Sequence, residues 1–316
     1  MPASKNYLYR QFFRLRIHES SGDGFQLLFS RIMAYCNPSF QAVSPWGNWG
    51  DGGNDGWIAA DNHYFQVFGP KPGTQTKELE AVKKAIGDFD KLIAKWGSVL
   101  KYTFVMNDRF QGIPAPIGAA LKGLKEAKSL LHVDSMGGME LLSRFMSLDD
   151  DIKQDIVGGI PDINVDFVDT RAVGELLGFL AGRTSSVITF LSETAPDFGK
   201  KISINQISNP IRARLEANSF QSHVIDEFLN ASDTALQQAI AQEVKDVYTE
   251  CKIAISENLD DFADLRYLWM VDKLIPPSIH EQPLAVAAYR NAAELVLAKY
   301  FETCDAYEHP NNVATT

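Results

Sequence analysis

Two short segments of the chain carry the kinds of residue that could hydrolyse a phosphodiester. The glycine-rich stretch from Gly50 to Gly56 contains Asp51 and Asp55, and the run from Tyr64 to Pro70 contains Gln66. Such hydrolysis needs hard oxygen ligands for Mg²⁺ and a cation near the attacking water or the developing charge. A hairpin with Asp55 at the head of one strand and Gln66 in the middle of the next could bring both side chains to one metal ion.

The local sequence predicts such a hairpin. Residues 57–68 read WIAADNHYFQVF, in which Ala60 to Asn62 supply a turn between two short runs of strand-forming residues. Because side chains alternate along a strand, the face that carries Gln66 is expected to carry Tyr64 and Phe68 as well.

The neighbouring segments predict the rest of an α/β domain. Apolar residues recur at helical spacing through residues 7–35, with a break at 20–24, and again through residues 77–96. The β-rich run KYTFVMND, a helix at about 117–129 and the short strand LLHVDS follow. This alternation, with a parallel crossover, predicts an α/β N-terminal domain with a mixed central sheet flanked by helices.

The second half of the chain is predicted to be mostly α-helical. A length of 316 residues favours two domains, and the cluster from Gly158 to Pro161 is the best candidate for the end of the first. Helical periodicity dominates beyond it, apart from a strand-like run near Val187. We therefore expect one domain at residues 1–160 and a helical docking or oligomerisation domain at residues 161–316.

The net charge of −10 is unevenly distributed along the chain. Residues 1–130 carry 16 Lys and Arg against 11 Asp and Glu, whereas residues 216–316 carry 6 against 17. The mildly basic front part could meet the phosphates of DNA, and the acidic rear part is better suited to contacting protein. The basic stretch from Lys71 to Lys101 either faces DNA or is an ordinary solvated helix face.

Several other kinds of chemistry find no support in the sequence. It has no GxxxxGK[ST] loop for nucleotides and no GxSxG turn for a nucleophilic serine. Its three cysteines lack the spacing of a zinc site or disulfide framework. The N-terminal residues contain neither a signal-peptide core nor a membrane-spanning run, so we expect a cytoplasmic protein without a membrane partner.

The first half resembles the restriction-endonuclease-like, or PD-(D/E)XK, fold. The resemblance rests on the order of a GFQ-x-LF helix at residues 24–29, the GDGGNDG loop and the YFQVFGP strand. The usual pattern of that family is a helix glutamate, an aspartate in a GDxGxDG loop and a Gln-x-Lys or Glu-x-Lys strand. Asp55 and Gln66 match this pattern, whereas Gln26 replaces the helix acid and Phe68 replaces the strand lysine.

This resemblance implies an endonuclease that cuts double-stranded DNA with Mg²⁺, for which Mn²⁺ can substitute. Asp55 and Gln66 would hold the metal, and Gln26 would orient the water. A displaced lysine would stabilise the phosphate charge; Lys71 is the first candidate. The other candidates are Lys77, Lys83 and Lys84. Asp51 is either a second ligand or only a turn residue.

The second half carries a separate resemblance. The segments ISINQISNPIRARLEAN, from Ile202 to Asn218, and YFETCDAYEHP, from Tyr300 to Pro310, are similar to the C-terminal domain of effectors in ABC three-component defence systems, of which Lamassu is the best-known type. The resemblance implies an effector held inactive by an SMC-like ABC ATPase and a third subunit. The effector would be released, or would form a homo-oligomer, when the ATPase senses foreign DNA.

A second hypothesis is an adaptor that kept the nuclease fold and binds DNA or protein without cutting. Its best support is Phe68 at the place of the strand lysine. Trp46, Trp49 and Trp57 around the glycine-rich loop could stack on bases or pack beneath the hairpin.

Overall fold

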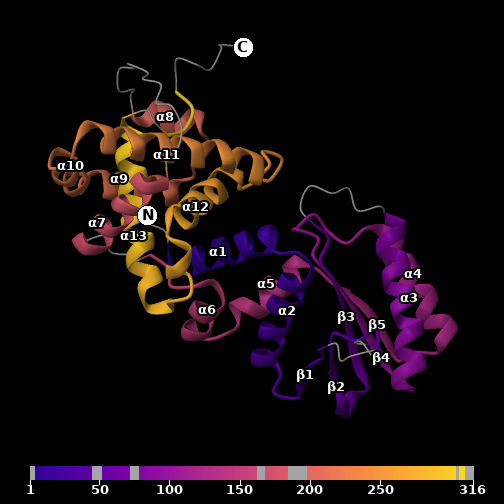
Figure 1. Cartoon of the computed structure of the whole chain (residues 1–316). Helices are drawn as coiled ribbons and strands as arrows, with labels where there is room; N and C mark the ends of the chain where they lie inside the picture. The colour runs from indigo at the N-terminus through magenta and orange to yellow at the C-terminus, as the bar shows by residue number, and fades with distance from the viewer. Residues whose placement is uncertain are drawn as a thin grey trace, which may run out of the picture. The chain divides into compact units, whose positions relative to one another are not determined.

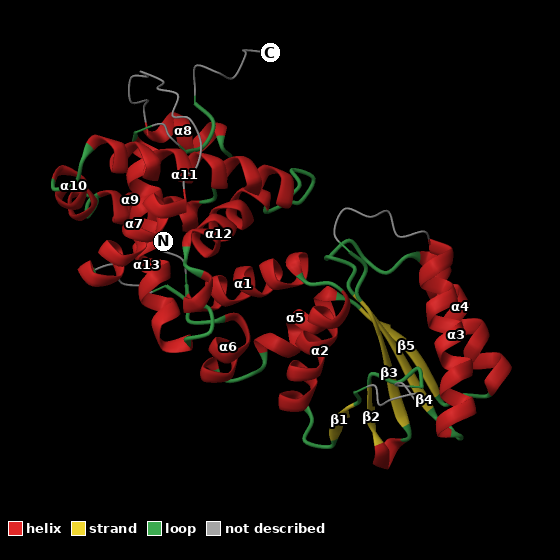
Figure 2. Cartoon of the chain, in the orientation of Figure 1, coloured by secondary structure: helices red, strands yellow, loops and turns green. Residues whose placement is uncertain are grey.

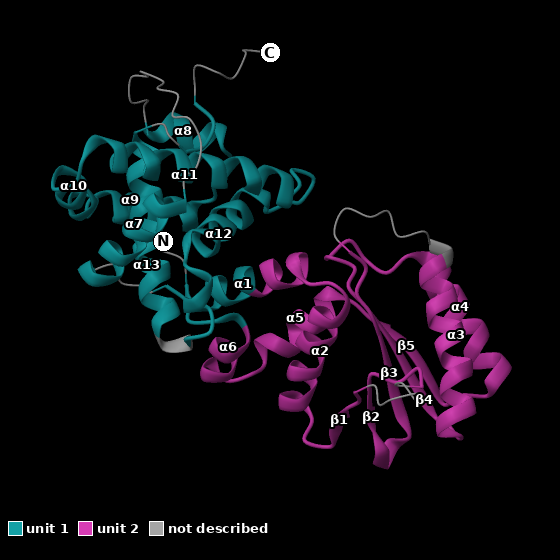
Figure 3. Ribbon diagram, in the orientation of Figure 1, with its two compact units in different colours: residues 1–12, 157–316 teal, residues 13–156 magenta. Residues whose placement is uncertain are grey.

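The chain divides into two compact units. The computed structural model describes residues 4–44, 52–71, 78–161, 168–183, 198–303 and 306–309, whose helices and strands are drawn in Figures 1 and 2. The unit drawn in magenta in Figure 3 comprises Phe13–Ile156 and is called here the sheet unit. The unit drawn in teal comprises Met1–Phe12 and Val157–Thr316 and is called the helical unit. Helix α1 (Lys5–Glu19) contributes residues to both units.

The sheet unit is built on one mixed sheet of five strands in the order β1-β2-β3-β4-β5. Strands β1, β2 and β3 are antiparallel neighbours, whereas β3, β4 and β5 run parallel. Parallel neighbours need a crossover, which α3 (Glu78–Trp96) and α4 (Ala115–Lys128) supply. The strands are β1 Phe40–Ala42, β2 Gly56–Ile58, β3 His63–Phe68, β4 Lys101–Met106 and β5 His132–Met136.

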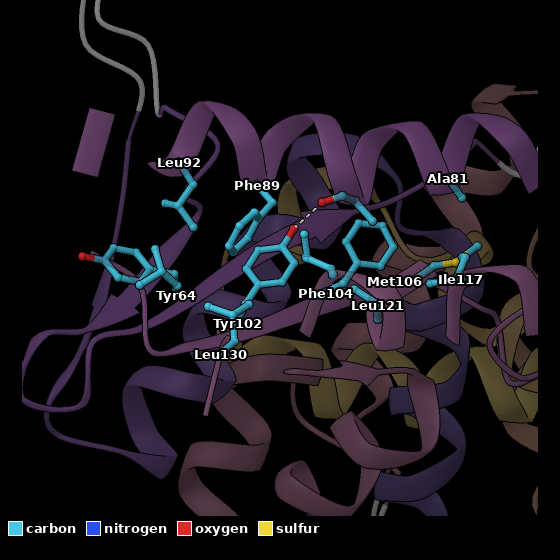
Figure 4. Packing of buried hydrophobic residues seen from close by; sticks show 13 residues of the cluster. Tyr64, Ala81, Phe89, Leu92, Tyr102, Phe104, Met106, Ile117, Leu121 and Leu130 are labelled. Atoms are coloured by element: carbon cyan, nitrogen blue, oxygen red, sulfur yellow. Dashed lines mark hydrogen bonds between the residues drawn. The ribbon is translucent and has the colours of Figure 1, made fainter. Parts of the chain in front are cut away.

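Helices α3 and α4 pack against one face of this sheet. Alternation along β3 and β4 turns Tyr64, Tyr102 and Phe104 toward these helices, where they join Phe89 of α3 in a buried apolar cluster (Figure 4). The Tyr102 hydroxyl donates to the Ala85 carbonyl of α3 at 2.9 Å, which satisfies a polar group inside the cluster. The crossover helix is thereby fixed over the middle of the sheet.

The opposite face of the sheet is covered by α2 (Gly22–Cys36), which also contacts α5 (Gly138–Met146). Phe65 of β3 points to this face, and its ring lies 5.6 Å from that of Phe29 on α2 and 5.7 Å from that of Phe40 on β1. The sheet is thus buried between two helical layers. Helix α6 (Asp150–Val157) follows α5 along the chain.

The helical unit has buried charged residues at its centre. Arg214 and Glu294 form an ion pair between α9 and α13, with both side chains about 1% exposed. Arg290 of α13 pairs with Asp272 of α12 at 2.7 Å. The helices are α7 Thr170–Arg183, α8 Phe198–Ile204, α9 Asn209–Ser219, α10 His223–Asn230, α11 Thr234–Ala254, α12 Phe262–Leu274 and α13 Pro283–Glu302; η3 (Pro277–Ile279) is a 3₁₀ turn.

The structure confirms the predicted mixed sheet between helices and the mostly helical second half. The unit division falls at residues 156 and 157 and groups residues 1–12 with the helical unit, whereas the sequence favoured a boundary near residue 160. The assignment of a nuclease domain and a docking domain to these stretches stays a prediction. The strand-like run near Val187 lies outside the described residues.

Candidate functional site

Asp55 and Gln66 meet in the sheet unit, as the predicted hairpin requires. The β2–β3 register pairs Gly56 with Phe65, and the Asp55 amide extends the ladder by donating to the Phe65 carbonyl at 2.9 Å. The Asp55 carboxylate then accepts through Oδ2 from Gln66 Nε2 at 2.7 Å and from the Val67 amide at 2.6 Å. Asp55 and Gln66 are 3% and 1% exposed, so this is a buried, hydrogen-bonded pair.

One acceptor of this pair is left open. Gln66 Oε1 is buried and has no hydrogen-bond partner in the described part of the chain. A buried amide oxygen without a partner costs free energy unless water or a cation meets it. Water or a hard cation would satisfy it, and an amide oxygen near a carboxylate is the kind of donor that Mg²⁺ accepts. A metal site at Asp55 and Gln66 stays a prediction.

The loop that carries Asp55 depends on a close backbone approach. Gly53 has a φ of +77°, and a Cβ placed on it would lie 2.2 Å from the Asp88 carbonyl oxygen of α3. Only glycine fits this position, because a larger residue would be strained and would collide with the helix backbone. The adjacent Asn54 side chain accepts from the Gly56 amide at 3.1 Å, which helps to hold the start of β2.

A second buried carboxylate lies beside this loop. Asp88 of α3 is 3% exposed and pairs with Lys84 at 2.5 Å and Lys91 at 2.9 Å. Burial, followed by the charges of Asp88 and Asp55, raises the pKa of the Tyr102 hydroxyl well above its ordinary value, so both carboxylates act on the same buried ring. The sequence analysis missed Asp88. The sequence did contain a signal for its burial: Asp88 lies three residues after Ala85, on the apolar stripe of the same helix.

The remaining predicted site residues are less closely gathered. Gln26 is half-buried on α2, and α2 packs against the face of the sheet to which Phe65 points. Because side chains alternate along β3, Gln66 points to the opposite face. Lys71 is exposed and follows β3 by three residues. The roles of Gln26 and Lys71 stay predictions. Asp51 and Lys77 lie outside the described residues.

Phe68 shows why the strand offers no lysine. Its ring is half-buried and stacks on Phe104 with the centroids 6.2 Å apart, so the position belongs to the apolar layer under α3 and α4. Trp57 packs in the same way, 5.3 Å from the Trp96 ring and 5.7 Å from the Tyr64 ring. For Trp57 the packing interpretation therefore holds. Trp46 and Trp49 lie outside the described residues.

The described residues contain no group of three or more His, Cys, Asp or Glu side chains able to hold a metal ion. A metal site at Asp55 would therefore combine one carboxylate with the neutral oxygen of Gln66. Such a set binds more weakly than two or three carboxylates and favours a cation that also keeps water or phosphate ligands, as Mg²⁺ does.

The second half of the chain is similar to a known domain. Residues 171–308 match the model of C-terminal domain 10 of the ABC-three component (ABC-3C) systems. The matched residues span α7 to α13 and the segment that follows, and are called here the CTD10 region. The match supports membership in these multi-component systems and confirms to that extent the resemblance of residues 202–218 and 300–310.

The other comparisons found no relatives. No curated protein and no solved structure matched the chain. Among the described helices, none is long and apolar enough to span a membrane.

Proposed function

We propose that the protein is a metal-dependent DNA endonuclease, the effector of an anti-phage ABC-3C system of the Lamassu type. The observation that carries the proposal is the buried pair of Asp55 and Gln66, with Gln66 Oε1 open to a ligand. The order of helix α2, the β2–β3 hairpin, crossover helix α3 and parallel strand β4 supports the restriction-endonuclease-like fold. The CTD10 match supports the ABC-3C system.

Asp55 and Gln66 would hold one Mg²⁺ or Mn²⁺ ion. The ion would neutralise charge on the scissile phosphate and lower the pKa of a bound water. Asp55 would supply the negative charge, and Gln66 would contribute Oε1 while its Nε2 keeps the Asp55 carboxylate in place. Gln26 was predicted to orient the water, but α2 covers the opposite face of the sheet from Gln66, so the proposal assigns it no step.

Two lysines are candidates for the cation that would stabilise the phosphate charge. Lys71 follows β3 and is exposed, so its side chain could turn toward a bound phosphate. Lys84 is anchored on α3 by its ion pair with Asp88, whose backbone touches the Gly53 loop. Lys71 and Lys84 are therefore both kept as candidates for this cation.

Double-stranded DNA would be bound through its backbone. Helices α3 and α4 carry exposed lysines that could neutralise phosphates without reading bases. They are Lys83, Lys91, Lys95, Lys122, Lys125 and Lys128. Little sequence preference is therefore expected.

The helical unit would connect the nuclease to its regulators. An SMC-like ABC ATPase and a third subunit would hold the effector inactive until foreign DNA is sensed, after which the effector would be released or would form a homo-oligomer. The CTD10 match and the excess of 17 Asp and Glu over 6 Lys and Arg in residues 216–316 support a protein-binding role for this unit.

A non-catalytic adaptor is the second candidate, and Phe68 favours it. The strand position of the missing lysine is filled by an aromatic ring stacked on Phe104, and the Asp55 carboxylate already accepts two hydrogen bonds. An adaptor would bind DNA or its partner subunits through the same surfaces without using Asp55.

Cleavage of linear and supercoiled plasmid distinguishes these candidates. The full-length protein is incubated with Mg²⁺ or Mn²⁺, alone and with the proteins encoded beside it. The nuclease proposal predicts cutting that Asp55→Ala abolishes, and a loss of rate for either Lys71→Met or Lys84→Met, which identifies the cation. Binding of DNA with no cutting under any of these conditions would favour the adaptor.

A further inference from the structure

The CTD10 region contains a pocket of about 190 Å³ that the nuclease proposal does not use. It opens between the α8–α9 connection, α11, the start of α12 and residues 306–309 near the end of the chain. Its size suits one long side chain rather than a nucleotide or a large cofactor.

The wall made by residues 306–309 is held firmly in place. The Asn205 amide group donates to the Glu308 carbonyl at 3.0 Å and accepts from the Glu308 amide at 2.9 Å. Tyr307 has a φ of +72° and Gln206 a φ of +54°, and both line the pocket. Left-handed conformations are unfavourable for these residues, so the surrounding contacts must maintain the shape of the pocket.

The guanidinium in the pocket wall is already engaged. Arg266 is 6% exposed and donates to the Ile255 carbonyl through Nε at 3.1 Å and through Nη2 at 3.0 Å. Its Nη1 donates to Glu257 Oε1 at 3.1 Å. A positively charged group with its donors used in this way cannot be the main attraction for an anionic ligand.

The two carboxylates of the pocket have acceptor capacity left. Glu257 is 69% exposed in its side chain and receives only the Arg266 bond, at Oε1. Glu308 Oε1 accepts from Tyr248 at 3.1 Å and Lys252 at 2.8 Å. The second oxygen of each carboxylate accepts no hydrogen bond from the described part of the chain, so the pocket offers acceptors to a donor.

Aromatic rings complete the lining. Tyr248 and Tyr307 lie with their ring centroids 5.0 Å apart, and Phe262 lines the wall formed by α12. The Tyr307 hydroxyl is buried and has no hydrogen-bond partner among the described residues. Lys252 Nζ lies 5.0 Å from the centroid of the Tyr248 ring, and the Arg266 guanidinium lies 5.0 Å from that of Phe262. The groups that remain for a further donor are therefore the second carboxylate oxygens and the Tyr307 hydroxyl.

We propose that this pocket receives one basic side chain, arginine or lysine, from a polypeptide partner. A polypeptide is favoured over a free small cation because the CTD10 region matches a domain of multi-component systems, whose subunits must contact one another. The acidic excess of residues 216–316 adds long-range attraction for a basic segment. The inference rests on one part of the proposed function, namely that the protein has partner subunits. It does not depend on DNA cleavage.

Peptide binding to the full-length protein tests the inference. The probes are a blocked peptide with one central arginine, its lysine counterpart, a matched peptide with citrulline in place of arginine, and free arginine amide. Affinities are measured by calorimetry for the wild type, Glu257→Gln, Glu308→Gln, the double variant and the control Glu250→Gln. Glu250 is an exposed acid of α11 outside the pocket lining, so its variant makes the same charge change elsewhere.

The arginine and lysine peptides are expected to bind, the citrulline peptide to bind about tenfold or more weakly, and the double variant to lose a similar factor. Glu250→Gln should bind like the wild type. The proposal is overturned if neither basic peptide binds saturably, if citrulline binds as well as arginine, or if the double variant matches the control. Equal binding of free arginine amide and the arginine peptide would overturn the polypeptide part. None of these outcomes depends on nuclease activity.

Discussion

At the scale of single residues, the site depends on Gly53. Its left-handed φ and its approach to the Asp88 carbonyl leave no room for a Cβ. Gly53→Ala should therefore lower the free energy of unfolding by about 3 kcal/mol and displace the loop of Asp55. Gly87→Ala is the matched control, because Gly87 lies exposed in α3 with nothing near its missing Cβ, and it should stabilise by about 0.5–1 kcal/mol. Chemical denaturation measures both values, and equal effects would contradict this account of the loop.

The open acceptor of Gln66 gives a prediction about metal binding. Gln66→Glu would place a second carboxylate 2.7 Å from the Asp55 carboxylate, so it should cost about 2 kcal/mol of stability without divalent cations. Mg²⁺ or Mn²⁺ should recover that loss as a rise in melting temperature larger than that of the wild type. Gln66→Met, which removes the amide without adding charge, should show no response to metal. A metal response of Gln66→Met equal to that of Gln66→Glu would exclude this site.

The contact between Asp55 and Gln66 could be predicted from the sequence because a local hairpin brings them together. Residues eleven positions apart need only the turn at Ala60 to Asn62 to become neighbours. Asp88 could not be predicted in the same way, since its place beside the Gly53 loop depends on how α3 crosses the sheet. The pocket around Glu257 and Glu308 was also missed, because it joins segments about fifty residues apart.

At the scale of elements, the helical unit relies on a buried ion pair between α9 and α13. Arg214 Nε donates to Glu294 Oε1 at 2.8 Å, and Nη2 donates to Oε2 at 2.5 Å. Glu294→Leu alone should lower the free energy of unfolding by about 3–5 kcal/mol, because it leaves the buried Arg214 guanidinium without its carboxylate. The double variant Arg214→Leu with Glu294→Leu should cost clearly less than the two single losses added together. A double-mutant cycle with additive losses would contradict a direct coupling of the two helices.

Helical periodicity at residues 77–96, 207–218, 231–255 and 283–304 predicts α3, α9, α11 and α13, which are found within about three residues of these ranges. Helix α12 was missed apart from the acidic residues at its start, because 11 of its 13 residues are buried and no amphipathic pattern remains. Strand β1 was also missed, since three residues with one buried side chain give too little periodicity.

At the scale of the whole molecule, stability should depend on pH through buried His18 and half-buried His63 of the sheet unit. Burial, reinforced by Arg14 and Arg109, lowers the pKa of His18 to about 4, and burial with Lys101 lowers that of His63 to about 4. The unfolded chain protonates both near pH 6.5, so stability is lost as the pH falls from about 6.5 toward 4, on the order of 2 kcal/mol for each histidine.

Replacing both histidines with glutamine should flatten this loss between about pH 7 and pH 4.5. Urea unfolding at several pH values measures the slope. His223→Gln, at an exposed position of α10, is the matched control and should keep the slope of the wild type. An unchanged slope in the double variant would show that other groups govern the acid sensitivity.

The proposed nuclease activity depends on a metal ion held by Asp55. The most direct measurement is the rate at which supercoiled plasmid is cut in the presence of Mn²⁺ by the wild type, by Asp55→Asn and by Asp61→Asn. Asp61 is an exposed aspartate of the same hairpin and supplies the matched charge change. We predict that Asp55→Asn loses about a hundredfold or more of the rate while Asp61→Asn keeps it. Cutting by Asp55→Asn at the wild-type rate would contradict the account.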